Sequence, residues 1–420
     1  MTSPEKTTRL IVAAVAVGVF VRLAFALFYW QNKPLTHDEG EYLSLGLNMA
    51  AGRGFSADIP GVLVNPSAER FSRAPFYPAF IAAIAWLTQA STDQLPASVP
   101  RALQIVQSLL GSATIALGSL IAREFAGRRV GVMAAWLLAL YPPLIWTCAY
   151  ALSEALYTPL ALLATWLVSA SLDRRDAAAV PTNVAPIAWA GAVLGVAALT
   201  RPAALVFVAL ASAGLLVWRR AWAHAIVLPV VALLVIAPWT IRNYAVHHRF
   251  VAIAAEGGVT FWTGNHPLAI GEGDLAANPA LKRAQVAFRE RFAGQTPEAV
   301  EPFYYQDAWH YITTHPGATT WLVLKKFFYT WVPIGPSYRL HSPLYYGTTL
   351  LAYLPMLAVA TAGLWLAARS LRPPRALLLL AASSVIVGLI FFPQERFRLA
   401  VIDPTLCILA AARLGVRHHE

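Results

Sequence analysis

Long apolar segments recur along the whole chain and restrict its fold more than any other feature of the sequence. Windows of about 15–24 mainly apolar residues alternate with short polar connections. Inside a bilayer the backbone has no water to bind, so a chain can cross only as helices or as a closed barrel. Because the runs have the length of membrane-spanning helices, we expect an all-α, polytopic membrane protein that forms one domain over residues 1–420.

Composition agrees with this class and excludes several others. Hydrophobic residues make up 58% of the chain and charged residues 13%, outside the usual range of soluble domains. The net charge of +11 comes from arginines in short loops between apolar runs, which is typical of cytoplasmic loops and not of a nucleic-acid surface. Cys148 and Cys407 both lie in apolar runs, so neither a disulfide framework nor a zinc site is indicated.

The positions of the arginines predict the orientation of the spans. We expect about ten helical spans, at residues 10–30, 101–121, 130–149, 153–171, 186–200, 202–218, 222–240, 344–367, 376–392 and 399–412. The short connections between them contain Arg123, Arg128, Arg129, Arg174, Arg175, Arg219, Arg220, Arg369, Arg372 and Arg375. If these connections face the cytoplasm, both termini do as well, and Lys6 and Arg417 agree. No small-residue cleavage site follows the first run, so we expect it to be retained as an anchor.

The apolar segment Phe76–Leu87 decides the parity of this topology. It is too short to cross about 30 Å of hydrocarbon, and a crossing there would turn Arg123 and Arg128 outward. We therefore expect an interfacial or re-entrant helix within a long first loop, 31–100, on the external face. A second large external loop covers about 241–343.

An acidic cluster follows the first apolar run directly and consists of Asp38, Glu39 and Glu41. The pattern Thr36-x-x-Glu39 is a capping box, which predicts a helix over about 37–48. Helix capping is therefore one explanation for Asp38 and Glu39. It does not explain Glu41, which shares a helical face with Asp38, so that a cation or a proton-bearing substrate is expected between the two carboxylates.

Basic residues on the same predicted face complete a candidate site. Arg73 precedes Tyr77, an aromatic residue of the kind found at headgroup depth, and contact with lipid phosphates is the simpler explanation for this arginine. Arg201 stands between two apolar runs without a spacer, which holds its guanidinium at the membrane surface in a position suited to a phosphate. Arg396 lies just before the last predicted span.

Two further charged residues, Glu154 and Arg22, could have a structural role instead of a role in binding a substrate. Glu154 follows Ser153 at the start of a predicted span, where helix capping accounts for both residues. Arg22 lies inside the first predicted span and must face the interior of the bundle. The sequence leaves open whether its partner is an acidic side chain or the phosphate of a ligand.

Taken in order, these motifs resemble the bacterial C-type (GT-C) glycosyltransferases, relatives of the dolichyl-phosphate-mannose protein mannosyltransferases and of the transferases that add aminoarabinose to lipid A. The motifs are His37-Asp-Glu-Gly-Glu41 with Tyr42, Arg73-x-Pro-x-Tyr-Pro78, Leu152-Ser-Glu154, Leu199-Thr-Arg-Pro202, Trp239-Thr-Ile-Arg-Asn-Tyr244, Gly257-Gly258 with Gly264-Asn265, and Arg396-Phe-Arg398. They extend along nearly the whole chain. The chain ends soon after its last predicted span, so we expect no soluble C-terminal domain of the kind that some relatives carry.

The resemblance implies an inverting sugar transfer from a polyprenyl-phosphate donor, on the external face of the bacterial inner membrane. It assigns the essential acidic pair to Asp38 and Glu39, and phosphate binding to Arg73 and Arg201. The other candidate substrate-binding residues are Glu41, Tyr42, Tyr77, Glu154 and Arg396. The acceptor, whether protein, lipid or polysaccharide, is not identified.

The chemistry of this transfer fits the residues. It needs cations on the departing phosphate and a carboxylate for the hydroxyl proton, for which we expect Asp38. Because arginine can neutralise a lipid phosphate, we predict no cofactor and no obligatory metal ion, with a divalent ion as the alternative. A transporter or flippase for lipid-linked saccharides would instead show mid-membrane charges and an internal repeat. A ligase for diphosphate-linked oligosaccharides would not need the acidic pair.

Overall fold

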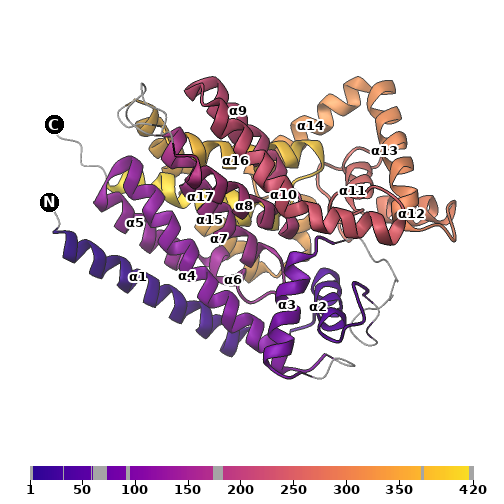
Figure 1. The fold of residues 1–420 in the computed structure, drawn as a ribbon, viewed down its shortest axis with the longest axis horizontal. Coiled ribbons are helices and arrows are strands. Elements are labelled where there is room, and N and C mark those ends of the chain that lie inside the picture. The colour runs from indigo at the N-terminus through magenta and orange to yellow at the C-terminus, as the bar shows by residue number, and fades with distance from the viewer. Residues whose placement is uncertain are drawn as a thin grey trace.

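The computed structural model describes residues 3–31, 33–57, 59, 73–90, 95–173, 183–369 and 373–415. Over these residues the fold consists of helices and loops, which confirms the predicted all-α class (Figure 1). In chain order the elements are α1 (Pro4–Ala24), the π-helix η1 (Phe25–Tyr29), α2 (His37–Ala50), α3 (Phe76–Leu87), α4 (Ser98–Ala126), α5 (Arg128–Leu140), α6 (Pro142–Trp146), α7 (Glu154–Leu172), α8 (Ala185–Thr200), α9 (Ala204–Arg219), α10 (Trp222–His247), α11 (Gly257–Gly264), α12 (Pro279–Glu290), α13 (Pro297–Thr314), α14 (Pro316–Trp331), the 3-10 helix η2 (Pro336–Leu340), α15 (Pro343–Arg369), α16 (Arg375–Ile390) and α17 (Glu395–Gly415).

Helices coincide with the predicted spans. Among the described residues, five helices are long and apolar enough to cross a membrane: α1 with η1, α4, α7, α10 and α15. Helices α8, α9 and α16 are apolar but have 16 residues each, about 24 Å at 1.5 Å per residue. The chain is a multi-pass helical membrane protein.

The predicted span 130–149 is divided into α5 and α6 by two prolines. Pro142 and the proline after it have no N–H to donate to the carbonyl groups of Leu138 and Ala139. The guanidinium of Arg22 donates to these two carbonyl oxygens instead, at 2.9 and 3.0 Å. The protein partner of Arg22 is therefore the end of an interrupted helix and not an acidic side chain.

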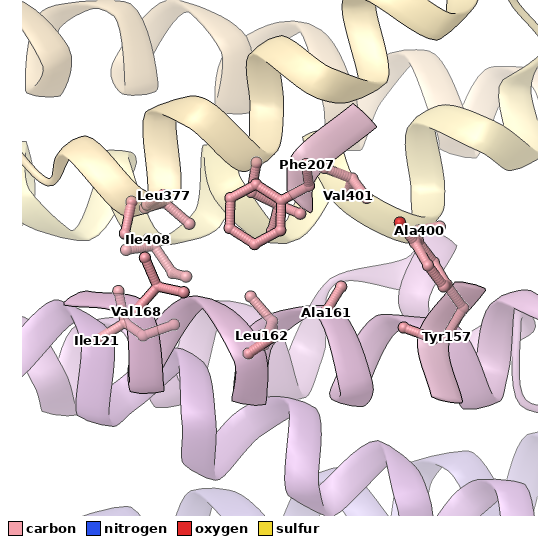
Figure 2. Packing of buried hydrophobic residues seen from close by; sticks show 14 of the residues in the cluster. Ile121, Tyr157, Ala161, Leu162, Val168, Phe207, Leu377, Ala400, Val401 and Ile408 are labelled. Carbon is pink, nitrogen blue, oxygen red and sulfur yellow. The ribbon is translucent and has the colours of Figure 1, made fainter. Parts of the chain in front are cut away.

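A continuous apolar core joins the long helices. Figure 2 shows Tyr157, Ala161 and Leu162 of α7 beneath Phe207 and Val401, which come from α9 and α17. Small residues bring some helices still closer, as at Gly363 of α15, where a Cβ would lie 1.9 Å from the carbonyl oxygen of Leu409 in α17. Helix α17 is thereby enclosed by the bundle.

Both termini of the described chain lie at one end of the bundle, whereas α2, α3 and α11–α13 lie at the other (Figure 1). At the end with the termini, a Cβ on Gly415 would lie 2.8 Å from Val130 at the start of α5. The side chain of Asp173 there accepts a hydrogen bond from the backbone N–H of Arg375. This arrangement agrees with the predicted parity, and the orientation in the membrane stays a prediction. Arg174, Arg175, Arg372 and Arg417 lie outside the described residues.

The first loop contains the two helices that the sequence predicts. The side-chain oxygen of Thr36 accepts the N–H of Glu39, and the Glu39 carboxylate accepts the N–H of Thr36, so α2 begins with a capping box. Helix α3 begins and ends at the predicted residues. It packs on α2 at Gly46, where a Cβ would lie 2.5 Å from Ile81. Its 12 residues span about 18 Å, too little for a crossing.

The second loop contains α11–α14, and its first three helices, α11–α13, share a small core of their own. Its buried residues are Trp262, Leu281, Phe288, Val300, Tyr304 and Ala308. Lys326 of α14 joins this group to the bundle, because its ammonium group donates to the carbonyl oxygen of Leu389 in α16 at 3.1 Å and to the side-chain oxygen of Asn265 at 2.9 Å. The second loop is therefore fixed against the helix whose last turns line the cavity described next.

Candidate functional site

A cavity of about 450 Å³ lies where residues of α2, α7, α9, α11, α16 and α17 meet. Arg73, Arg201 and Arg396 contribute positive charge to its wall. Its apolar lining comes mainly from α9, α16 and α17 and includes Val206, Val387, Phe391 and Val401. A cavity of this size and mixed lining is typical of a site for a small or medium-sized ligand.

Asp38 joins two of these arginines. Its Oδ1 accepts a hydrogen bond from Nη2 of Arg73 at 2.5 Å, and its Oδ2 accepts one from Nη1 of Arg396. Burial alone would raise the pKa of this carboxyl, but the two guanidinium groups hold the pKa of Asp38 well below its usual range. Asp38 is therefore ionised at neutral pH, with both oxygens engaged.

Arg73 is the cation that the spacing of Asp38 and Glu41 requires. Its Nε donates to Oε2 of Glu41 at 2.8 Å, and its Nη1 lies 3.5 Å from Oε2 of Glu256. The ring of Tyr42 lies beneath the guanidinium, with 5.2 Å between the guanidinium carbon and the ring centre. Carboxylates thus surround a guanidinium that also lines the cavity.

Arg201 and Glu154 form a second ion pair. Arg201 has an extended backbone at the end of α8, which is interrupted before Pro202, and its Nη1 lies 2.5 Å from Oε1 of Glu154. The side chain of Ser153 makes no capping bond to α7. Its oxygen instead accepts hydrogen bonds from Arg201 and from the Tyr42 hydroxyl, each at 3.4 Å.

Arg396 connects the two ion pairs. Besides its bond to Asp38, its Nε donates to Oε1 of Gln394 at 3.0 Å and lies 3.9 Å from Oε1 of Glu154. Three arginines and three carboxylates consequently alternate in one charge network: Glu41, Arg73, Asp38, Arg396, Glu154 and Arg201. This network joins the first loop to the starts of α7 and α17.

Glu39 does not line this cavity. Its Oε1 accepts the backbone N–H of Ala151 at 2.9 Å, and its Oε2 accepts the N–H and the hydroxyl of Thr36. The side chain is almost completely buried. Because Ala151 immediately precedes the Leu152-Ser-Glu154 motif, Glu39 positions that motif relative to α2. Its catalytic role stays a prediction.

Tyr77 also supports the site from behind. It is completely buried, and its hydroxyl donates to Oε1 of Gln107 at 2.7 Å. Gln107 in turn donates to the carbonyl oxygens of Cys148 and Tyr150 at 3.0 and 2.8 Å. Tyr77 therefore helps to hold the loop before α7 and is not at the surface of the bundle.

Arg398, the second arginine of the Arg396-Phe-Arg398 motif, forms a separate buried pair. Its Nε lies 3.0 Å from Oδ1 of Asp403, whose Oδ2 accepts the hydroxyl of Tyr141 at 2.9 Å. Tyr141 is the residue between α5 and α6, so this pair fixes α17 against the interrupted helix.

Glu256 also lines the cavity, and it was not among the residues predicted from the sequence. One third of its side chain is exposed. Burial, offset in part by Arg73 and reinforced by Glu41 and Asp38, raises the pKa of Glu256 to about 7. The available signal was its position directly before the Gly257-Gly258 pair.

No cluster of potential metal ligands is present in the part of the chain that the structure describes. No three His, Cys, Asp or Glu side chains are grouped there so as to hold an ion. Independence from metal ions stays a prediction.

Comparisons with known proteins bear on the fold. No protein-family model and no curated protein matches the chain. The oligosaccharyltransferase AglB from Archaeoglobus fulgidus, in complex with an inhibitory peptide and a dolichol-phosphate, matches with a TM-score of 0.59 at 17% identity, over 97% of this chain and 50% of that one. An oligosaccharyltransferase of the same organism, tethered to an acceptor peptide with the NVT sequon, matches with a TM-score of 0.60 at 18% identity, over 98% and 49%.

A third similarity is weaker. ArnT from Cupriavidus metallidurans bound to undecaprenyl phosphate has a TM-score of 0.44 at 16% identity, over 98% of this chain and 78% of that one, which is too low to carry an argument. The chain spans about half the length of the archaeal enzymes, and at these identities the likeness concerns the fold alone. The chain shares the fold of these archaeal oligosaccharyltransferases, which agrees with the fold that its motifs imply.

Proposed function

We propose that this protein is an inverting glycosyltransferase that moves a sugar from a polyprenyl-phosphate donor to an acceptor on the external face of the bacterial plasma membrane. The observation that carries this proposal is the placement of Arg73, Arg201 and Arg396 on the wall of a cavity whose remaining lining is largely apolar. A polyprenyl phosphate combines the two complementary properties, an anionic group and an apolar chain. The match to an archaeal structure that holds a dolichol-phosphate is consistent with such a donor.

The charge network explains how these arginines stay in place before a donor binds. Each of them contacts a carboxylate at present, and a guanidinium has five N–H donors, so the same group can bind a phosphate as well. When the bond between sugar and phosphate breaks, negative charge develops on the leaving oxygen. Cations that are already oriented stabilise this charge without reorganisation.

The contacts of Asp38 support a role for this residue in orienting the arginines. Its carboxylate is ionised and bound to Arg73 and Arg396, so it fixes both guanidinium groups at the cavity wall. Asp38 as the base stays a prediction. An anionic phosphate bound to the arginines would neutralise part of their charge and raise the basicity of Asp38.

The position of the network favours a transferase over a transporter. A transporter places its charged groups near the middle of the membrane, between repeats with broken helices. Here the charged residues come from the first loop, from the first residues of α7 and α17, and from Arg201 at the end of α8. A ligase would require a diphosphate carrier, which a binding experiment distinguishes from a monophosphate.

The test is binding of undecaprenyl phosphate and undecaprenyl diphosphate to the purified protein. We expect Arg73→Ala and Arg201→Ala to weaken binding of the monophosphate about ten- to hundredfold, since each removes charge-assisted hydrogen bonds of about 1.5–3 kcal/mol. Arg249→Ala, at an exposed arginine after α10, is the matched control. Arg201→Lys retains the charge and serves as a control for misfolding of the alanine variant.

Unchanged affinity in both alanine variants would assign these arginines to ordinary lipid headgroups and would overturn the donor site. Preference for the diphosphate would favour the ligase. Mass spectrometry of cell-envelope glycans from a strain that lacks the protein would then identify the sugar.

A further inference from the structure

We propose that a second cavity, between α11, α12 and α13, binds the acceptor, and that Glu256, in the wall common to both cavities, receives the proton of the acceptor hydroxyl group. This inference rests on the proposed function and adds two elements to it, the path of the acceptor and a catalytic carboxylate in the second loop.

The second cavity has a volume of about 460 Å³ and lies among residues of the second loop. Beside apolar residues, its wall contains amide, charged and aromatic side chains, among them Gln285, Arg289, Gln295, Phe292 and Tyr304. Side chains of these kinds bind the hydroxyl groups of a saccharide, while aromatic rings cover its apolar faces. We therefore assign this cavity to a saccharide acceptor.

Glu256 connects the two cavities. Of the described residues, it is the one that lines both. Its Oε2 lies 3.5 Å from Nη1 of Arg73, an arginine that we assign to the donor phosphate. An acceptor that enters along α12 and α13 thus meets this carboxylate on the way to the donor.

The end of α10 fixes the chain that leads to Glu256. Side chains of Trp239, Thr240 and Asn243 donate to three consecutive carbonyl groups in residues 251–253. Trp239 donates to the last at 2.8 Å, Thr240 to the middle one at 2.7 Å and Asn243 to the first at 3.0 Å. The Trp239-Thr-Ile-Arg-Asn-Tyr244 motif therefore has a physical role, which is to hold the segment that ends at Glu256.

The glycine pair after Glu256 fixes the other side. The N–H of Gly258 donates to Oε1 of Glu301 in α13 at 3.0 Å. A Cβ on Gly257 would lie 2.4 Å from the Tyr305 hydroxyl, and one on Gly258 would lie 2.6 Å from the carbonyl oxygen of Glu301. Only glycines allow α11 to lie this close to α13, which keeps Glu256 between the cavities.

The charges around Glu256 suit a base that works near neutral pH. Charged and titratable groups face it from both cavities: Arg73, Asp38, Glu41, Arg201 and Tyr42 on the donor side, and Arg289, Glu290 and Glu301 on the acceptor side. Burial is the main reason why the pKa of Glu256 is raised, to about 7, which is favourable for proton transfer at that pH. Asp38, by contrast, has both oxygens bound to arginines.

The proposed transfer is a single displacement at the anomeric carbon of the donor sugar. The acceptor oxygen attacks the anomeric carbon of the sugar from the side opposite the phosphate, and a new carbon–oxygen bond forms. The bond from that carbon to the phosphate oxygen breaks, and its electron pair leaves with the polyprenyl phosphate beside the arginines. The hydroxyl proton passes to the carboxylate of Glu256 and then to water, and the sugar is inverted.

The first experiment uses Glu256→Gln with a panel of undecaprenyl-phosphate hexoses and pentoses and methyl glycosides as acceptors. We expect affinity for undecaprenyl phosphate to be retained, while transfer falls about 10²–10⁴-fold. In the wild type, kcat/KM should rise with pH through about 7, because Glu256 must be deprotonated. The rise should be absent in Glu256→Gln and present in Asp38→Asn.

The second experiment fills the acceptor cavity. Val286 lines it, whereas its exposed neighbour Ala287 in α12 does not. Val286→Trp should raise the KM for the methyl glycoside and leave undecaprenyl phosphate binding unchanged, and Ala287→Trp should do neither.

The outcomes separate this inference from the proposed function. A pH rise that persists in Glu256→Gln but disappears in Asp38→Asn would assign the proton to Asp38 and overturn the role of Glu256. Transfer to a serine- or threonine-containing peptide and to no glycoside would overturn the saccharide acceptor. A wild-type protein that binds undecaprenyl phosphate no better than Arg73→Ala would overturn the proposed function itself.

Discussion

The carboxylate of Glu39, at the start of α2, accepts a hydrogen bond from the backbone N–H of Ala151, 2.9 Å away in the loop before α7. This bond connects segments that are 112 residues apart in the chain. It brings Asp38 and Glu154, the two carboxylates that contact Arg396, to the same side of the cavity. The acidic pair therefore has a divided role, with Asp38 directed at the arginines and Glu39 directed at the backbone.

Glu39→Ala should destabilise the protein. The substitution leaves the buried N–H groups of Ala151 and Thr36 without their acceptor, and each costs about 1–3 kcal/mol. Thermal unfolding of the detergent-purified protein should show a lower midpoint, and transfer should fall with the folded fraction. Glu5→Ala, which removes an exposed ion pair with Arg9, is the control and should have little effect. An unshifted midpoint for Glu39→Ala would contradict the positioning role.

Asp38→Asn tests the charge network. Asparagine keeps the size of the side chain and caps a helix about as well, but it removes the charge that orients Arg73 and Arg396. We expect transfer to fall about 10²-fold, as for a displacement of about 1 Å between reacting groups, with a much smaller change in thermal stability. A variant that binds undecaprenyl phosphate and transfers sugar at the wild-type rate would end any catalytic role for Asp38.

Arg22 is predicted to stabilise the fold through its hydrogen bonds to the end of α5. Arg22→Leu removes the donors to the carbonyl oxygens of Leu138 and Ala139, which Pro142 and its neighbour cannot replace. Unpaired carbonyl groups inside the bundle cost about 1–3 kcal/mol each. The unfolding midpoint should fall well below that of Arg9→Ala, an exposed control in the same helix. Undecaprenyl phosphate affinity of the folded fraction should be unchanged, and a loss of affinity would instead indicate a phosphate ligand for Arg22.

The features that the sequence predicted depend on neighbours in the chain. The capping box at Thr36 and Glu39 determines where α2 begins, and the apolar segment Phe76–Leu87 forms α3 at the predicted residues. The cation expected between Asp38 and Glu41 is Arg73, which the sequence had already indicated as a candidate site residue. The two helix positions follow from local patterns, and the spacing of Asp38 and Glu41 predicted a cation between them, although its identity as Arg73 depends on a contact 32 residues away in the chain.

The features that the sequence could not predict depend on contacts between distant segments. Glu256 approaches Arg73 from a position 183 residues away, and its burial between two cavities raises its pKa. The partner of Arg22 exists only because α5 ends at two prolines and packs beside α1. Tyr77 was predicted to lie at headgroup depth, because its burial against Gln107 of α4 exists only in the folded chain.

Accessibility labelling tests the orientation of the protein. Cys148 and Cys407 are buried and should not react, so single exposed cysteines can be added without removing them. A cysteine at position 249, after α10, should be labelled from outside intact cells, and one at position 128, at the start of α5, should not. Labelling of position 128 from outside would reverse the parity and place the network on the cytoplasmic face.

The last prediction separates positioning of Glu256 from stability of the second loop. Asn243→Ala removes the hydrogen bonds to the carbonyl groups of Val251 and Ile253, so the segment that ends at Glu256 is no longer held. A displacement of about 1 Å between reacting groups can reduce the rate about 10²-fold. We expect transfer to methyl glycosides to fall by this order while affinity for undecaprenyl phosphate is retained. Tyr244→Phe changes an exposed side chain in the same turn of α10 and should leave both measurements unchanged.

Thermal unfolding of both variants completes this test. If Asn243→Ala lost transfer only in proportion to its folded fraction, Asn243 would be a structural residue with no bearing on Glu256. A selective loss of transfer, combined with a pH dependence that still rises through about 7, would show that the same carboxylate still acts as the base from a poorer position. Loss of undecaprenyl phosphate binding in Asn243→Ala would contradict the separation of donor and acceptor sites, because Asn243 donates to the carbonyl groups of Val251 and Ile253, neither of which lines the donor cavity.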